Sequence, residues 1–254
     1  MPMLYRPAAK PTRPSRAAPR VMAPMAIAGA NVEFKLGDAL VAALPEGALW
    51  VAESKTLIVS DIHFEKGSSY ALRGQMLPPY DTHAALMKLT DLMLRLQPDI
   101  VVSLGDSFHD SGGPARMDAR DRDLLKLLMS RCDWIWVEGN HDGRAPETLG
   151  GAVREVLHIG ALVLRHEPTL NAAPGEIAGH LHPCAKVSGR GRSVRRRCFA
   201  TDGARLVMPA FGAYTGGLNV CDDAYAPIFA DGVTALVLGK DRVLPVASDR
   251  LLSD

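Results

Sequence analysis

Apolar residues in the first half of the chain alternate between short unbroken runs and longer segments with helical spacing. The runs at residues 57–59, 100–102 and 134–137 predict buried strands. Between them, residues 81–97 and 118–131 place leucines on one face at helical spacing, which predicts two packing helices. This alternation is typical of an open α/β sheet with parallel strands, in which the chemistry lies at the carboxyl ends of the strands.

The second half of the chain has few helix signals and many strand-like runs, joined by short turns that contain Gly or Asp. These runs lie at residues 153–157, 161–165, 194–200, 205–210 and 233–238. An α/β half followed by a strand-rich half predicts two sheets packed face to face with helices outside. We expect a single domain over residues 31–254.

The formal net charge of +1 is spread unevenly along the chain. Residues 1–32 hold five basic and no acidic residues, residues 186–205 carry a net charge of +6, and the remainder is acidic. Residues 1–30 are rich in Pro, Arg and Ala without a hydrophobic period, which predicts a disordered basic arm. Both basic segments are candidates for contact with a polyanion, although a solvated surface explains them equally well.

Composition also narrows the setting of the protein. No run approaches the roughly 18 consecutive apolar residues of a membrane-spanning helix, so we expect no membrane partner. The four cysteines show no C-x-x-C pairing, which argues against a disulfide framework and against a structural zinc ribbon. A reducing, cytoplasmic setting fits this cysteine usage best.

Five short clusters of Asp, Asn and His stand beside the ends of predicted strands. Asp61 and His63 are two residues apart, so in an extended segment their side chains share one side. His180 and His182 repeat this arrangement, and Asp106 has two oxygens with which to bridge two cations. The candidate metal ligands are Asp61, His63, Asp106, Asn140, His166, His180 and His182.

This ligand set combines carboxylate, amide and imidazole groups without a thiolate, which suits manganese, iron or zinc better than calcium. Two such cations about 3.5–4 Å apart can hold a bridging hydroxide, neutralise a phosphate and stabilise the attacking and leaving oxygens of an in-line displacement. A motif of this kind that occurs alone often contains only a histidine of the core or of the surface. Five such motifs in a consistent order argue against a chance occurrence. The sequence therefore predicts a dinuclear phosphoesterase, with two divalent ions and manganese as the first choice.

The motifs resemble those of the calcineurin-like metallophosphoesterases, whose order D-x-H, G-D, G-N-H-D/E, H and G-H-x-H is matched within residues 56–183. The resemblance implies the fold of that class, a four-layer αββα sandwich. It assigns one metal to Asp61, His63 and His182, the other to Asn140, His166 and His180, and the bridging role to Asp106.

The resemblance also implies that His141 approaches the scissile phosphate and protonates or stabilises the leaving oxygen. The usual family form is G-D-x-x-D, whereas here one more residue separates Asp106 from the next aspartate, Asp110. Either His109 or Asp110 is therefore a candidate to orient the His141 ring.

A narrower resemblance lies beyond the last metal motif, at residues 189–195 and 206–217. Together with residues 61–70, these segments are similar to the bacterial ligase-associated DNA damage response endonucleases (PdeM), over most of residues 45–240. Members of that family are associated with an ATP-dependent DNA ligase, a helicase and a nuclease of a repair cluster. The resemblance implies a DNA phosphodiesterase or endonuclease that acts in repair by in-line attack of a metal-bridging hydroxide.

The basic segment supplies the candidate DNA contacts, and its arginines alternate with Gly and Ser as in a mobile loop. The candidate substrate-binding residues are Arg190, Arg192, Arg195, Arg196 and Arg197. Two other functions stay open. One is a phosphodiesterase or phosphatase for a small nucleotide or other phosphate ester, because the metal core does not select what carries the phosphate. The other is a non-catalytic subunit that docks DNA or repair proteins, against which the complete ligand set argues.

Overall fold

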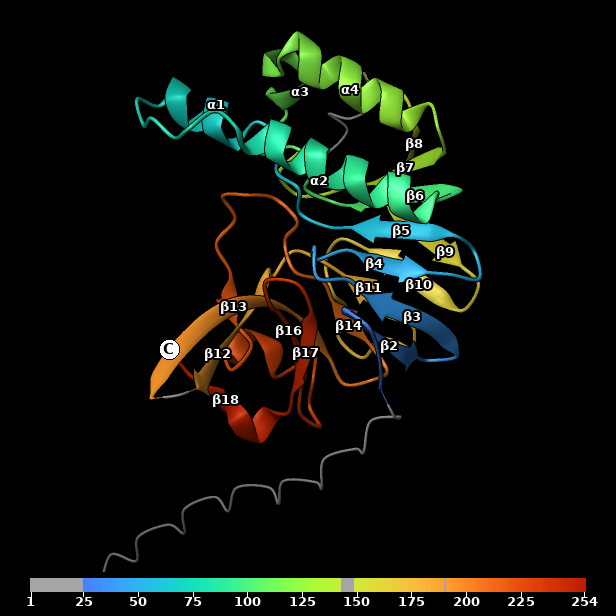
Figure 1. Cartoon of the computed structure of the whole chain (residues 1–254), viewed down its shortest axis with the longest axis vertical. Helices are drawn as coiled ribbons and strands as arrows, with labels where there is room; N and C mark the ends of the chain where they lie inside the picture. Colours follow the sequence, from blue (N-terminus) through green and yellow to red (C-terminus); the bar gives the residue numbers. More distant parts are fainter. Residues whose placement is uncertain (1–24, 143–148, 190) are drawn as a thin grey trace, which may run out of the picture.

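A mixed eight-stranded sheet forms the first half of the molecule (Figure 1). The computed structural model describes residues 25–142, 149–189 and 191–254. In this sheet the strands lie in chain order: β1 (Ala26–Ala28), β2 (Asn31–Leu36), β3 (Ala39–Ala43), β4 (Leu49–Val51), β5 (Thr56–Val59), β6 (Ile100–Leu104), β7 (Asp133–Val137) and β8 (Ala152–Arg154). Strands β1 to β5 pair antiparallel and β5 to β8 pair parallel.

Helices connect the parallel strands and cover one face of this sheet. They are α1 (Lys66–Leu72), α2 (Asp81–Leu96), α3 (Gly113–Arg116) and α4 (Ala119–Met129). Helix α2 buries Leu86, Leu89 and Met93 against the sheet, and α4 begins where Asp118 caps the backbone N–H of Arg120. Because β5 is covered on both faces, all four of its residues are buried and apolar alternation is lost.

All strands of the second sheet come from the second half of the chain. Its strands are β9 (Val156–Ile159), β10 (Leu162–Arg165), β11 (Glu176–Ala178), β12 (Pro183–Gly189), β13 (Arg192–Thr201), β14 (Leu206–Val207), β15 (Leu218–Asn219), β16 (Thr234–Leu238), β17 (Val243–Val246) and β18 (Leu251–Leu252). Two short 3-10 helices, η2 (Asp223–Tyr225) and η3 (Ser248–Arg250), lie between its last strands.

Three apolar clusters define the layers of the sandwich. One lies between the two sheets and joins residues such as Ile58 and Val102 to Phe199 and Leu236. A second lies between the first sheet and α2 and α4, which Figure 1 shows on the outer side of that sheet. The third lies on the far face of the second sheet, where residues 220–229 with η2 form the cover. The predicted α/β sandwich is confirmed, with this segment in place of an α-helix as its fourth layer among the described residues.

The predicted strands and helices of the first half are all present, and the antiparallel strands β1 to β4 precede them. Strand β1 falls inside the predicted basic arm, so ordered structure begins before residue 31. Residues 1–24 of that arm lie outside the described residues. Within the described residues, no helix combines the length and the apolar character required to cross a bilayer.

Candidate metal centre

The carboxyl ends of three parallel strands bring the first motifs together. Asp61 follows β5, Asp106 follows β6 and Asn140 follows β7, so all three lie at the same edge of the first sheet. Backbone hydrogen bonds join the first two segments, from Asp61 N to Gly105 O at 3.2 Å and from His63 N to Asp106 O at 2.9 Å. The second sheet adds the remaining ligands to this edge: His166 after β10, and His180 and His182 between β11 and β12.

Asp61, His63 and His182 form the first group of ligand atoms. His182 Nε2 lies 3.3 Å from His63 Nε2 and 3.2 Å from Asp61 Oδ1. The three atoms all lie within 4.8 Å of one another, a spacing that fits one cation. Burial lowers the pKa of His63 to about 3 despite the nearby Asp61 and Asp106 carboxylates. The imidazole is therefore neutral, which is the form that binds a metal.

Asn140, His166 and His180 form the second group. Asn140 Oδ1 lies 2.9 Å from His166 Nε2 and 3.0 Å from His180 Nδ1, and these two nitrogens are 3.3 Å apart. Burial opposes protonation of His166, but a hydrogen bond to Asp106 and the charge of Asp61 outweigh it and raise its pKa to about 9. A cation bound here therefore competes with a proton for His166.

The Asp106 carboxylate faces both groups. Its Oδ1 is 3.4 Å from His166 Nε2 in the second group, and its Oδ2 is 3.9 Å from His63 Nε2 in the first. Burial raises the pKa of Asp106, but the hydrogen bond and charge of His166 prevail and hold it at about 2. An ionised carboxylate with one oxygen toward each group is the arrangement that a ligand shared by two cations requires.

Five of the candidate ligands adopt the left-handed backbone conformation, which L-residues rarely do. The φ angles are 51° at Asp61, 50° at His63, 46° at Asp106, 68° at His180 and 46° at His182. Such residues cost of order 1–3 kcal/mol each and persist only where the surrounding structure holds them. Their concentration in a single site is typical of a functional site, where strained backbone conformations lower the stability of the fold but position the functional side chains.

Two glycines allow the chain to approach the ligands closely. A Cβ atom at Gly105 would overlap the His166 ring, and one at Gly179 would overlap Ser60 Oγ and crowd the Asp61 carboxylate. Ser60, which the sequence analysis did not single out, is fully buried and donates from Oγ to Asp61 Oδ2 at 2.6 Å. Its position directly before Asp61 at a strand end was the one signal available in the sequence.

His141 stands at the mouth of the site, with 44% of its side chain exposed. Its Nδ1 lies 3.2 Å from the carbonyl oxygen of His109, and because a carbonyl can only accept, Nδ1 carries the proton. The His109 ring also stacks on the His141 ring at a centroid distance of 5.6 Å. Asp110 instead pairs with Arg116 at 2.8 Å. Of the two candidates for orienting His141, His109 makes the contact.

The basic segment forms a β-hairpin rather than a loop, in which β12 and β13 pair from Cys184 opposite Arg197 to Gly189 opposite Arg192. The alternation of arginine with small residues was misleading because it also fits an exposed, twisted hairpin strand. Arg192 and Arg196 are exposed and lie on one face of β13. Arg190 lies outside the described residues.

Two arginines of the segment are engaged by the protein itself. Arg195 donates to the Gly217 carbonyl at 2.7 Å and lies 3.2 Å from an Asp254 carboxylate oxygen. Arg197 is half-buried, and its Nη1 donates to the carbonyls of Ala210 at 2.7 Å and Gly212 at 3.1 Å. Arg197 thus holds the chain beside the metal centre, and the exposed face expected of the segment reduces to Arg192 and Arg196 among the described residues.

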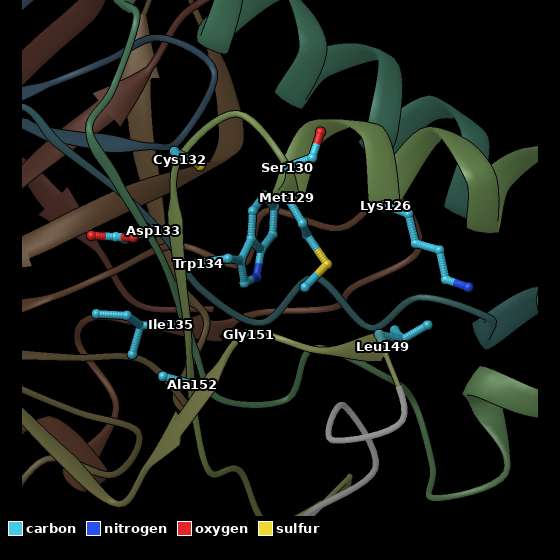
Figure 2. Close-up of a pocket in the computed structure, with 10 residues that line it drawn as sticks. All are labelled: Lys126, Met129, Ser130, Cys132, Asp133, Trp134, Ile135, Leu149, Gly151 and Ala152. Carbon is cyan, nitrogen blue, oxygen red and sulfur yellow. The ribbon is translucent and has the colours of Figure 1, made fainter.

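The metal centre is separate from the cavity shown in Figure 2, which has a volume of about 620 Å³. That cavity is lined by the end of α4, the beginning of β7 and the segment that leads into β8, with Met129, Trp134 and Leu149 among its residues. It therefore lies toward the amino end of β7, whereas the ligands follow the carboxyl ends of the strands. None of the candidate ligands lines it.

Comparison with known proteins agrees with this geometry. A family model described as calcineurin-like phosphoesterase matches residues 54–193, more than half of the chain. The crystal structure of the nuclease MPE from Pseudomonas putida is similar at 26% identity and a TM-score of 0.67, over 85% of this chain and 100% of that one. The phosphoesterase Yfce from E. coli is similar at 18% identity and a TM-score of 0.40, over 76% and 98% of the two chains. No curated protein gives a significant match.

The matched residues contain all seven candidate ligands and His141, and they include the three strand ends that carry the first motifs. Divalent cations follow from the family, and the fold brings together clusters of His and Asp side chains that could hold them, among them Asp61, His63 and His182. The chain belongs to the calcineurin-like phosphoesterase family and is a metal-dependent phosphoester hydrolase.

Proposed function

We propose that this hydrolase is a manganese-dependent DNA phosphodiesterase or endonuclease that uses two cations. The observation that carries the proposal is the Asp106 carboxylate, which faces one group of ligand atoms with each oxygen. The similarity to a nuclease over the whole length of that protein supports nucleic acid as the substrate class. The motifs at residues 189–195 and 206–217 support a role in repair beside an ATP-dependent DNA ligase, a helicase and a nuclease.

The proposed ligand sets are Asp61, His63, His182 and Asp106 for one cation, and Asn140, His166, His180 and Asp106 for the other. Two bound cations supply a nucleophile from water and stabilise charge on the phosphate. His141 then provides the proton for the leaving oxygen. Its Nδ1–H is directed to the His109 carbonyl, so Nε2 is the nitrogen left for the substrate, and it can donate a proton only from the doubly protonated form of the ring.

The openness of the site favours a polymer over a small ester. His141 and His182 expose 44% and 20% of their side chains and Asn140 is exposed, while the candidate ligands beneath them are buried, namely Asp61, His63, Asp106 and His166. A phosphodiester within a long chain needs such an open approach, whereas small esters are usually bound in closed pockets. Strand β12 begins directly after His182, so the exposed arginines of the hairpin extend from the edge of the site.

The test of substrate class is plasmid nicking by manganese-loaded protein, run beside hydrolysis of bis-nitrophenyl phosphate and nitrophenyl phosphate. We expect the plasmid to be converted to nicked and linear forms, and Asp106→Asn to abolish hydrolysis of all three substrates. Parallel loading with iron and zinc tests the choice of metal. If the protein hydrolyses either small ester rapidly but leaves the plasmid intact, the enzyme is a hydrolase of small phosphate esters and the proposal is wrong.

The hairpin is tested with the double variant Arg192→Ser/Arg196→Ser. Its matched control is Arg120→Ser/Arg131→Ser, which removes the same charge from exposed positions on and just after α4. Loss of two phosphate contacts should reduce the slope of the logarithm of the DNA binding constant against the logarithm of the salt concentration, by up to about the contribution of two contacts. Hydrolysis of the small diester should be unchanged. Equal DNA binding by the parent, the hairpin variant and the control at low and physiological salt would show that the hairpin does not bind DNA.

A further inference from the structure

A cavity of about 450 Å³ lies next to the segment Ala210–Gly212, between the turn before β4, helix α2, strand β13 and the turn after β16. Its walls carry four cationic side chains, Lys88, Arg95, Arg197 and Lys240, and two carboxylates, Glu46 and Asp241. None of the candidate metal ligands lines it. The cavity is therefore a second concave, charged surface of the molecule with no assigned role.

Only one of the four cations is neutralised by a carboxylate of the cavity lining. Glu46 pairs with Arg95 at 2.8 Å, and Asp241 lies 3.4 Å from Arg242, which is outside the lining. Lys88, Arg197 and Lys240 form no ion pair with any described residue. The cavity thus presents an excess of positive charge, which attracts an anion.

Lys88 and Arg197 are both half-buried, and Arg197 retains unused donors. Lys88 donates to the carbonyls of Phe211 at 2.7 Å and Glu46 at 3.2 Å, and its ammonium group also lies 3.5 Å from the centroid of the Phe211 ring, so it supplies positive charge to the cavity rather than a free N–H group. Arg197 uses Nη1 for the carbonyls of residues 210 and 212, and its Nε and Nη2 make no hydrogen bond with the described residues. Burial and the neighbouring Arg197 lower the pKa of Lys88 to about 7, against the opposing effect of the Glu46 carboxylate.

The same two side chains connect the cavity to the metal centre. They hold the carbonyls of residues 210–212, while the amides of this segment hold the strand end that carries Asp61. Phe211 N donates to Ser60 O at 2.8 Å, and Gly212 N donates to Asp61 O at 3.3 Å. Two hydrogen-bonded steps therefore lead from the cavity to the backbone of a candidate ligand.

We infer that this cavity binds a phosphate group, with Arg197 as its hydrogen-bond donor, Lys88 as a neighbouring positive charge and Lys240 at its rim. A guanidinium edge with two free N–H groups matches the spacing of two phosphate oxygens, and an ammonium group beside it adds charge. The phosphate belongs either to a small free anion that regulates the enzyme or to the backbone of a polynucleotide that also reaches the metal centre. Binding of phosphate in this cavity does not require the metals. The inference can therefore be tested independently of the proposed function.

The test is calorimetric titration of the full-length protein with inorganic phosphate, in the presence of a chelator that removes phosphate binding at the metal centre. The informative variant is Lys240→Glu, because Lys240 is exposed and forms no ion pair with the described residues. The matched control is Lys35→Glu, an exposed lysine of β2 outside the cavity. We expect saturable binding near one phosphate per chain, weakened about tenfold or more by Lys240→Glu and unaffected by Lys35→Glu.

Sulfate provides a second measurement, because its charge stays constant over the pH range in which Lys88 titrates. Sulfate binding should weaken as pH rises above about 7, and Lys88→Met should remove this dependence. Titration with a short oligonucleotide decides the source of the phosphate: weakening by Lys240→Glu indicates a polynucleotide backbone, and no change indicates a small free anion. Absence of saturable phosphate binding, or equal binding by Lys240→Glu and Lys35→Glu, would overturn the inference.

Discussion

Gly179→Ala is the substitution that tests most directly how the Asp61 carboxylate is held. The added Cβ would overlap Ser60 Oγ and lie 2.5 Å from Asp61 Oδ2, while the Leu104 carbonyl at 3.3 Å limits retreat. Ser60 and Asp61 are fully buried, so the clash can be relieved only by moving them. Overpacking of this kind costs about 1–3 kcal/mol in the free energy of unfolding.

The displacement should also weaken metal binding, because it disturbs the two hydrogen bonds that orient the carboxylate. These come from Ser60 Oγ at 2.6 Å and from His180 N at 3.1 Å. Loss of such outer contacts commonly lowers metal affinity or activity about 10- to 100-fold. Gly216→Ala is the matched control, since a Cβ there meets nothing within 4 Å. It should change stability by no more than about 0.5 kcal/mol.

The assay combines thermal unfolding with metal content per chain, measured for Gly179→Ala, Ser60→Ala and the double variant. Ser60→Ala removes the atom that the new methyl group overlaps, so the double variant should recover part of the lost stability. A coupling energy of about 0.5–3 kcal/mol is expected for residues in direct contact. A Gly179→Ala protein that melts with the parent and holds its metal equally well would refute this account of the site.

Three further predictions address the ligands, the proton donor and the cavity. Asp106→Ala should lose cations from both groups and all hydrolysis while circular dichroism shows a retained fold; a variant that still binds two ions contradicts the shared role. His141→Ala should keep its metal but lose turnover by roughly 10²–10⁴-fold, less on nitrophenyl esters, whose leaving groups need little protonation. Because the pKa of Lys88 is lowered to about 7 in the folded protein, the unfolded chain binds more protons above that pH. Stability should therefore gain with rising pH between about 7 and 10 relative to Lys88→Met, and parallel pH profiles of the two proteins would exclude this.

The meeting of the candidate ligands that follow β5, β6 and β7 could be predicted from the sequence, because it depends on local order. Parallel strands end at one edge of a sheet, so polar residues after β5, β6 and β7 must meet wherever those strands pair. Apolar runs bounded by polar motifs were sufficient to locate these strands. The short antiparallel strands β1 to β4 were not predicted, although the strict alternation of polar and apolar residues in β2 is a local signal of a half-buried strand. Strands β3 and β4 lack such alternation.

Contacts between segments distant in sequence could not be predicted. The orientation of His141 depends on a backbone carbonyl, which every residue has, so nothing in the side-chain sequence indicates it. Arg197 looked like its neighbours in the basic segment, yet its position opposite Cys184 at the base of the hairpin turns it inward to residues 210–212. A run of arginines indicates positive charge, but only strand pairing decides which of them reach solvent.

Asp61 shows how the fold supports a strained ligand. Its φ of 51° is unfavourable, and its carboxylate is fully buried beside other candidate ligands. The carboxylate is oriented from within by Ser60 and by the His180 amide, and its backbone is held from outside by Gly212, whose own carbonyl is held by Arg197. Each contact comes from a different part of the chain, so the strained conformation exists only when both sheets are assembled. A candidate metal site built in this way depends on the complete sandwich, because its candidate ligands come from both halves of the sequence.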